Sequence, residues 1–189
     1  MINSEFQKII NLYLPNLKGE SLNSVINHSS LFNSNKGSQL ISEGKKHNYF
    51  YIILNGAVKC YYSKDSREIC TWFAFEKDVI GTISTYEGLP SKETIELLED
   101  SEFIRFNLEQ LKELSKSNLQ IIHILNNLIL EHTLFIEERL YQLQFMTSQE
   151  RYLAIIDASP EILQRVSLTD IASFLGISRE TLSRIRKKK

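Results

Sequence analysis

The sequence predicts an α+β protein in which an antiparallel β roll is followed by one long helix and a small helical domain. Between residues 31 and 106, short β-branched and aromatic runs alternate with polar or Gly-containing breaks, as in a roll of short strands. Residues 118–145 contain neither Gly nor Pro, and residues 167–187 show two short helical patterns on either side of Gly176. We therefore divide the chain into a roll at 1–115, a long helix at 116–146 and a C-terminal domain at 147–189.

The first domain begins with two predicted helices and continues with five predicted strands. Apolar residues from Phe6 to Tyr13 recur at helical spacing behind Ser4, and residues 21–27 indicate a second short helix. The predicted strands lie at 49–54, 57–62, 69–75, 78–81 and 102–106, with a hairpin loop at 63–66. Asn107 then begins a helix, because Asn107 followed by Gln110 resembles a capping box.

The long helix carries more apolar surface than a roll of this size needs. Its apolar rows contain Ile122, Ile129, Ile136 and Leu143 at intervals of seven, flanked by Leu125, Leu128, Phe135 and Leu140. At about 1.5 Å per residue the helix would run roughly 42 Å, which is longer than a domain this small can cover. We expect part of the stripe to pack on a second copy of the chain. The alternative is an ordinary core helix lying on the roll.

Bulk composition fits a globular protein. The 189 residues, 42% of them hydrophobic, are enough for a substantial core. Residues 1–5 lack the pattern of a signal peptide and no stretch reaches the roughly 18 apolar residues of a membrane span, so a cytoplasmic location is expected. Cys60 and Cys70 are too few for a disulfide framework or a four-cysteine cluster. Structural thiols are one interpretation, and redox sensing on a shared hairpin is the other.

The charge of the chain is distributed unevenly. The net charge is −1, yet residues 178–189 hold six Lys or Arg against one acid, while the rest of the chain holds 16 basic against 22 acidic residues. An acidic body with one basic end suits a protein that touches a polyanion at that end only. The alternative is a basic tail that only makes the protein soluble. The pattern of residues around these charges distinguishes the two interpretations.

That pattern is a predicted helix-turn-helix. Ser167 has the spacing of a helix cap, and the helix that it starts ends at Gly176, where a residue tolerant of positive φ is needed. Ser178 caps the next helix, whose Leu182 and Ile185 turn inward. The predicted DNA-contacting residues are Ser178, Arg179, Glu180, Thr181, Ser183, Arg184, Lys187 and Lys188. A hairpin of helices that only pack together is the alternative.

The outward residues suit the chemistry of base pairs and phosphates. Arg pairs with guanine O6 and N7, Glu accepts from the cytosine amino group, and Ser or Thr hydroxyls bind phosphate. We therefore expect Arg184→Ala to alter base preference, and loss of Lys188 or Lys189 to weaken binding to all sequences alike.

The chain resembles the Crp/Fnr regulators over nearly its whole length. The most specific stretch is residues 171–186 (IASFLGISRETLSRIR), supported by residues 147–153 (TSQERYL), by Glu43 and Gly44 and by residues 56–58 (GAV). The resemblance implies a cyclic nucleotide-binding-type roll, a dimerisation helix and a C-terminal helix-turn-helix with little or no wing. It also implies a homodimeric transcription regulator that binds double-stranded DNA, with Arg179, Glu180 and Arg184 reading bases and RNA polymerase as a further partner.

The family's nucleotide-binding cassette is altered in this sequence. The candidate effector pocket consists of Gly81, Thr82, Ile83, Ser84, Lys92, Glu93 and Thr94. By the resemblance, a Glu that holds the ribose and an Arg that pairs with the cyclic phosphate are both replaced. Lys92 keeps one charge without the bidentate fork of Arg, and Glu93 opposes an anionic ligand. We therefore do not expect cyclic AMP to bind, and the roll either takes another small molecule or serves as a scaffold.

Two other classes of function have their own sequence requirements. A metal-dependent enzyme on a β roll needs clustered ligands, whereas His28, His47, His123 and His132 are scattered, and no nucleophile motif is present. The chain is therefore expected to be no enzyme and to hold no metal or cofactor. The stronger alternative is a ligand-sensing or protein-interaction module whose helix-turn-helix no longer binds DNA.

Overall fold

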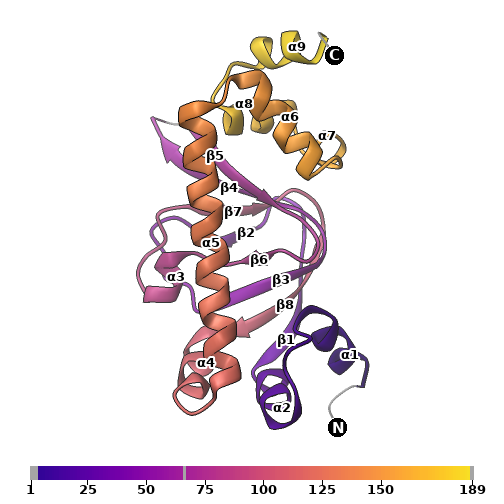
Figure 1. Ribbon diagram of the computed structural model, residues 1–189, viewed down its shortest axis with the longest axis vertical. Helices are drawn as coiled ribbons and strands as arrows, with labels where there is room; N and C mark the ends of the chain where they lie inside the picture. The colour runs from indigo at the N-terminus through magenta and orange to yellow at the C-terminus, as the bar shows by residue number, and fades with distance from the viewer. Residues whose placement is uncertain (1–3, 66, 188–189) are drawn as a thin grey trace.

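Two short helices, α1 (Ser4–Tyr13) and α2 (Gly19–Asn27), precede the roll and pack against its lower end (Figure 1). The computed structural model of the protein describes residues 4–65 and 67–187. Both helices confirm the prediction from apolar spacing, since Ile10, Val25 and Ile26 are buried. They close one end of the roll and leave the other end free for the C-terminal helices.

The roll consists of two antiparallel sheets. Its strands are β1 (Ser29–Ser34), β2 (Gln39–Ile41), β3 (Tyr49–Asn55), β4 (Val58–Lys64), β5 (Arg67–Ala74), β6 (Val79–Ile80), β7 (Thr94–Leu97) and β8 (Ser101–Asn107). Among the described residues, each sheet has four strands, ordered β1-β8-β3-β6 and β2-β7-β4-β5. Apolar side chains fill the space between the sheets, including Ile41, Ile53, Ile80, Ile95, Leu97 and Phe103. The predicted antiparallel roll is confirmed.

Five strands match the sequence prediction, whereas β1, β2, β7 and helix α3 (Ile83–Glu87) were not predicted. The sequence of β1, SSLFNS, has little intrinsic strand preference. It is held in the sheet by its partner, with Ser29 opposite Phe106 and Ser34 opposite Ser101 in β8. Strand formation at β1 therefore depends on tertiary pairing.

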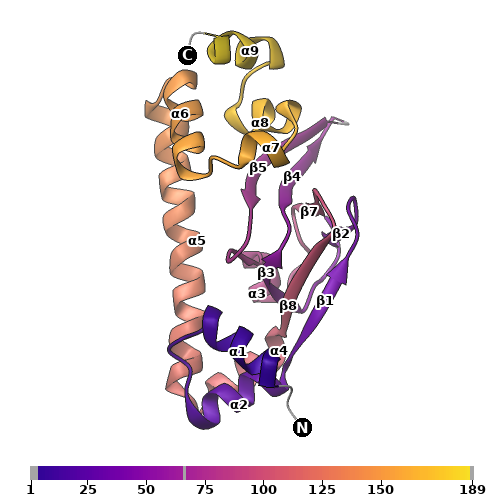
Figure 2. The ribbon, with the colours of Figure 1, turned by 90° about the vertical axis from the view of Figure 1, so that its right-hand side faces the viewer.

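The hairpin of β4 and β5 projects toward the C-terminal helices (Figure 2). Lys64 pairs with Arg67, so the strands extend further than the loop predicted at 63–66. Asp65 adopts a left-handed conformation with φ of 50° in the turn, and Ser66 lies outside the described residues. The longer strands carry the side chains of the hairpin up to the C-terminal domain.

Helix α5 (Leu119–Phe145) confirms the predicted long helix and stands beside the roll in both views (Figures 1 and 2). Its first turns follow α4 (Leu108–Ser115), and the Asn118 side chain caps it by accepting from the amides of Gln120 and Ile121. Only Ile121 and Leu125 are buried. The large apolar side chains that remain exposed include Leu130, Leu134, Ile136, Leu140, Tyr141, Leu143 and Phe145. The interpretation as a core helix therefore holds only for the first half.

The same helix is more apolar than a count of consecutive apolar residues indicates. An 18-residue window of α5 has a mean hydropathy of 1.3, which by length and composition alone is enough for a membrane-crossing helix. A count of consecutive apolar residues does not detect this window, because Asn126, Asn127 and His132 interrupt the apolar stretch. Only 11% of the window is buried within the chain, so α5 offers a long uncovered apolar surface.

The described residues after α5 form four helices: α6 (Ser148–Ala158), α7 (Ile162–Arg165), α8 (Leu168–Leu175) and α9 (Arg179–Lys187). The predicted capping box at Thr147 is present, since Thr147 Oγ1 accepts from the Glu150 amide at 3.3 Å and Glu150 Oε2 accepts from the Thr147 amide at 2.7 Å. Helix α7 was not predicted. The core of these helices includes Tyr152, Ile171, Leu175 and Leu182 and continues into Ala57, Cys70 and Phe75 of the roll.

Candidate functional site

Helices α8 and α9 are joined by a tight turn at residues 176–178. Ser167 Oγ accepts from the Asp170 amide at 3.1 Å and starts α8. Gly176, at φ of 67°, ends it in the left-handed conformation that glycine adopts without a steric cost. Ser178 Oγ then accepts from the Thr181 amide at 3.2 Å and starts α9. Both predicted caps are thus present.

The inner and outer faces of α9 agree with the pattern in the sequence. Leu182 is buried and Ile185 is half-buried, and both pack with α8. The exposed residues from the cap onward are Ser178, Arg179, Glu180, Ser183, Arg184, Arg186 and Lys187. Thr181 is half-buried and its hydroxyl accepts from Arg184 Nη2 at 3.1 Å. Lys188 lies outside the described residues, and Arg186 joins this surface although it was not among the predicted residues.

One acid shares this basic surface. The pKa of the Glu180 carboxyl lies below its usual range because backbone amide hydrogen bonding and the Ser178 hydroxyl stabilise the charged form. Arg184, Arg186 and Lys187 lie in the last turn of α9. The surface therefore presents several positive charges and one ionised carboxylate, which is an acceptor for an amino group.

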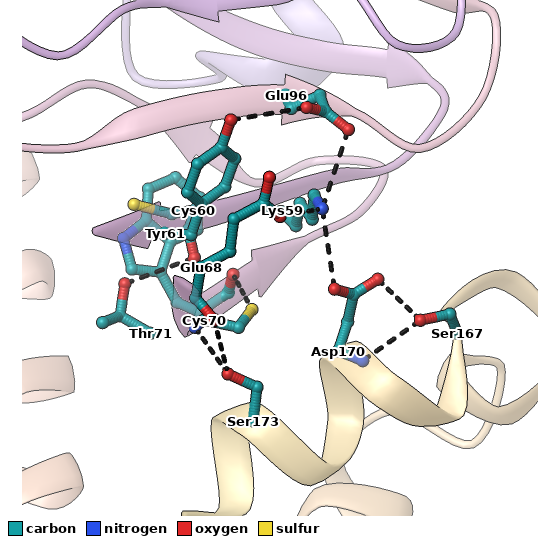
Figure 3. A network of polar contacts seen from close by, with 11 residues as sticks. Lys59, Cys60, Tyr61, Glu68, Cys70, Thr71, Glu96, Ser167, Asp170 and Ser173 are labelled. Carbon is teal, nitrogen blue, oxygen red and sulfur yellow. Dashed lines mark hydrogen bonds and ion pairs between the residues drawn. The ribbon is translucent and has the colours of Figure 1, made fainter. Parts of the chain in front are cut away.

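A polar network fixes α8 to the hairpin of β4 and β5 (Figure 3). Ser173 Oγ accepts from the Cys70 amide at 3.0 Å and donates to the Glu68 carbonyl oxygen at 3.2 Å. Asp170 reaches Lys59 Nζ at 3.5 Å. The helix that precedes α9 is thus bonded directly to the roll.

Lys59 is the centre of that network. Its Nζ lies 2.8 Å from Glu68, 3.7 Å from Glu96 and 3.5 Å from Asp170, and its side chain is only 10% exposed. Burial acts to lower the pKa of Lys59, but the hydrogen bond to Glu68 and the negative charges outweigh it and hold that pKa above its usual value. Without this ammonium group, three carboxylates would face one another at the interface between the roll and α8.

A second ion cluster joins α7 to the loops of the roll. Arg165 forms a bidentate pair with Glu76 at 2.7 and 2.8 Å and also contacts Glu99. Glu76 accepts in addition from the Gly56 amide at 2.9 Å. The hydrogen bond from Arg165 is the main reason that the pKa of Glu76 is lowered to about 2.

This cluster gives the protein a predicted acid sensitivity. Because the folded-state pKa of Glu76 is lowered, its contribution to stability is present above about pH 4.5 and is lost as the pH falls toward about 2. We expect the melting temperature of the wild type to fall across this interval, and Glu76→Gln to show a smaller fall from a lower starting value. Parallel curves for the two proteins in calorimetry would contradict this role of Glu76.

Two arginines hold the C-terminal end of α8. Arg151 donates to the carbonyl oxygens of Leu175, at 3.0 Å, and Met146, at 2.6 Å. Arg139 of α5 donates to the Phe174 carbonyl oxygen and stacks on the Phe174 ring at 3.8 Å. Burial and the nearby charge of Arg151 lower the pKa of Arg139 to about 10. Cations at a helix C-terminus complement its dipole. Because Arg139 belongs to α5, these contacts bond α8 to α5 as well as to the roll.

The candidate effector pocket forms a cavity of about 520 Å³ between the roll, α5 and α8. Five predicted residues line it, namely Thr82, Ile83, Ser84, Lys92 and Glu93. Gly81 instead lines an adjacent cavity of about 250 Å³, where a Cβ atom would lie 1.8 Å from the Phe50 ring. Thr94, the first residue of β7, is buried and accepts from the Glu43 amide at 3.2 Å. The prediction did not include the wall made by His132, Phe135, Arg139 and Phe174.

Both cysteines are free and buried. Burial is the main reason that the pKa of each thiol is raised, to about 12 for Cys70. The reactive form of a cysteine is the thiolate, which these environments suppress. The buried environments of Cys60 and Cys70 therefore favour structural thiols over redox sensing.

The first domain consists of two antiparallel sheets with α3 between β6 and β7, and the long helix α5 follows it. This arrangement defines its fold class. Residues 32–118 match the family model described as the cyclic nucleotide-binding domain. The chain therefore contains such a domain, although its pocket carries Glu93. Among the described residues, no group of three or more His, Cys, Asp or Glu is placed where it could hold a metal ion.

Solved structures match over most of the chain. FixK2 from Bradyrhizobium japonicum has a TM-score of 0.73 at 22% identity, over 85% of this chain and 83% of that one. The c-di-GMP-responsive global regulator CLP of Xanthomonas campestris has a TM-score of 0.69 at 18% identity, over 88% and 89%. A protein described as a transcriptional regulator of the Crp/Fnr family from Eubacterium rectale has a TM-score of 0.74 at 18% identity, over 94% and 87%.

These matches confirm the resemblance to Crp/Fnr regulators at the level of the fold. Identities below 25% do not carry over a ligand or a DNA sequence. None of the curated proteins is similar enough in sequence to count as a match.

Proposed function

We propose that the protein is a sequence-specific transcription regulator that binds double-stranded DNA as a homodimer in the cytoplasm. The observation that carries the proposal is the exposed face of α9, where basic and hydroxyl side chains surround one ionised carboxylate. The buried Leu182 fixes which face points outward. An α-helix with such a face fits the major groove.

In this proposal the predicted DNA-contacting side chains divide into two groups. Arg179, Glu180 and Arg184 contact base edges, because bidentate and acceptor groups distinguish base pairs. The hydroxyls of Ser178, Thr181 and Ser183 and the amino groups of Lys187 and Lys188 contact phosphates, which position the helix without reading sequence.

The uncovered apolar row on α5 supports the homodimer. Ile136, Leu140 and Leu143 are each about half exposed within one chain. Such a row on a long helix is covered when a second copy of the helix packs against it. A twofold dimer places two α9 helices on one DNA, so half-sites are expected about 10 to 10.5 base pairs apart, or at a multiple of that spacing.

Selection of binding sites from a randomised duplex library, at one stated salt concentration, tests the proposal. Enrichment of an inverted repeat is the expected result. Enrichment of single half-sites would contradict the dimer. A library without enrichment would favour the ligand-sensing or protein-interaction module, and the same selection with a bound effector would then decide.

The Arg184→Ala substitution separates base reading from general attraction. We expect it to cost about 1 to 3 kcal/mol at one position of each half-site and to relax the preference there, since a bidentate contact to guanine is lost. Lys187→Ala is the control and should weaken binding to specific and random duplexes alike. Equal losses on both duplexes for Arg184→Ala would contradict its role.

The roll is proposed to act without cyclic AMP. Glu93 lines the pocket as a buried side chain, and an anionic phosphate beside a buried carboxylate is unfavourable. Calorimetry that showed micromolar binding of cyclic AMP would contradict this. By the resemblance to Crp/Fnr regulators, RNA polymerase is a further expected partner.

A further inference from the structure

The cavity of about 520 Å³ lies where three parts of the chain meet. Its volume falls within the range of small-molecule sites, about 300 to 1,000 Å³. Tyr62 and Trp72 of the roll, Phe135 of α5 and Phe174 of α8 supply aromatic walls. A molecule bound there contacts the roll, the long helix and the helix that precedes α9 at the same time.

Glu93 supplies a buried negative charge to this cavity. The residue is 7% exposed, and its Oε2 accepts a hydrogen bond from Cys60 Sγ at 2.9 Å. Among the ion pairs between described residues, none includes Glu93. A buried carboxylate without a cation is costly, so a cation that enters the cavity gains a favourable partner.

Two cations line the cavity, but neither is paired with Glu93. Lys92 is exposed to solvent. Arg139 donates to the Phe174 carbonyl oxygen and stacks on the Phe174 ring. Burial and the charge of Glu93 raise the pKa of Tyr62 to about 12. The cavity thus combines aromatic side chains with one buried carboxylate that forms no ion pair among the described residues.

We propose that this cavity binds a small organic cation, an amine with an apolar body, whose ammonium group pairs with Glu93. The body would lie among Trp72, Phe135 and Phe174, because aromatic faces attract both apolar groups and cations. The same carboxylate disfavours phosphates. Calling this amine an effector rests on the proposed function. Its binding to the cavity does not, because binding is measured in the absence of DNA.

The test uses Trp72, the single tryptophan of the chain, as a fluorescent reporter in the cavity wall. The full chain is titrated with 2-phenylethylamine and with 3-phenylpropionate, which share an apolar body and differ in charge. We expect saturable binding of the amine with a Kd of about 1 mM or below, and binding of the acid at least about tenfold weaker. Equal binding of both, or no amine binding up to about 10 mM, would overturn the proposal.

Two neighbouring substitutions make the test specific. Glu93→Gln keeps the shape and removes the charge, and should weaken amine binding by about tenfold or more. Lys92→Gln removes the adjacent positive charge and should leave binding unchanged or tighter. Unchanged affinity in folded Glu93→Gln, checked by thermal melting, would overturn the role of Glu93. If the selection enriches an inverted repeat but no amine binds, only this inference is refuted. If the amine binds but no sequence is enriched, the inference about the cavity stands and the proposed DNA binding does not.

Discussion

Replacing Lys59 by methionine is expected to lower the free energy of unfolding by about 2 to 3 kcal/mol at neutral pH. The substitution leaves Glu68, Glu96 and Asp170 facing one another without their cation. Removing one partner from a fully buried pair costs about 3 to 5 kcal/mol, and the half-exposed Glu68 reduces this value. Because the pKa of Lys59 is raised, its contribution is complete below about pH 10.4 and is lost only as the pH rises above that.

Lys64→Met is the matched control, since Lys64 is on the same strand and exposed. It should change stability by less than about 0.5 kcal/mol. Denaturant unfolding measures both variants, and hydrogen exchange locates the effect. We expect faster exchange in α8 for Lys59→Met, because Asp170 links that helix to the roll. Equal stability of the two variants would show that the network does not hold the domains together.

Leu140→Glu is expected to weaken dimerisation by about a thousandfold. Each dimer would bury two carboxylates in the apolar row, and a cost of about 2 kcal/mol for each gives a total near 4 kcal/mol. Leu140 is 55% exposed in the single chain, so the substitution should leave the monomer folded. Sedimentation equilibrium measures the dimer, and affinity for the inverted repeat should fall with it.

Leu134→Glu is the control on the same helix. Leu134 is 54% exposed, nearly as much as Leu140, but six residues place it about 120° away around the helix. We expect this variant to remain dimeric. If Leu134→Glu dissociates the dimer and Leu140→Glu does not, the copies pack through the other apolar face of α5, and the row from Ile129 to Leu143 is not the interface.

Elements with strong local signals could be predicted from the sequence. The α5 pattern, the Thr147 capping box and the strands of the β4 and β5 hairpin all depend on residues close together in the chain. Strands β1, β2 and β7 were missed because pairing with distant strands, rather than local composition, holds them in place. The same reason applies to the network around Lys59, whose partners come from β5, β7 and α8.

The candidate sites show the same division. The outward face of α9 follows from helical periodicity over nine residues. For the pocket, Glu93 lines the cavity, whereas its neighbour Thr94 begins β7 and is hydrogen-bonded to the amide of Glu43. Both residues are buried, and a local pattern in the sequence does not separate their roles. The wall contributed by α5 and α8 depends on how the domains pack, which no motif in the sequence encodes.

The bonds of Arg139 and Arg151 to the end of α8 have a consequence for how such a regulator changes during evolution. Arg139 belongs to α5 and Arg151 to α6, so the position of α9 follows the axis of the long helix. In a dimer, substitutions that alter how two α5 helices cross would change the distance between the half-sites. Substitutions on the outer face of α9 would change the preferred bases instead. In such a dimer, the distance between the half-sites and the bases preferred within each half-site would therefore evolve independently.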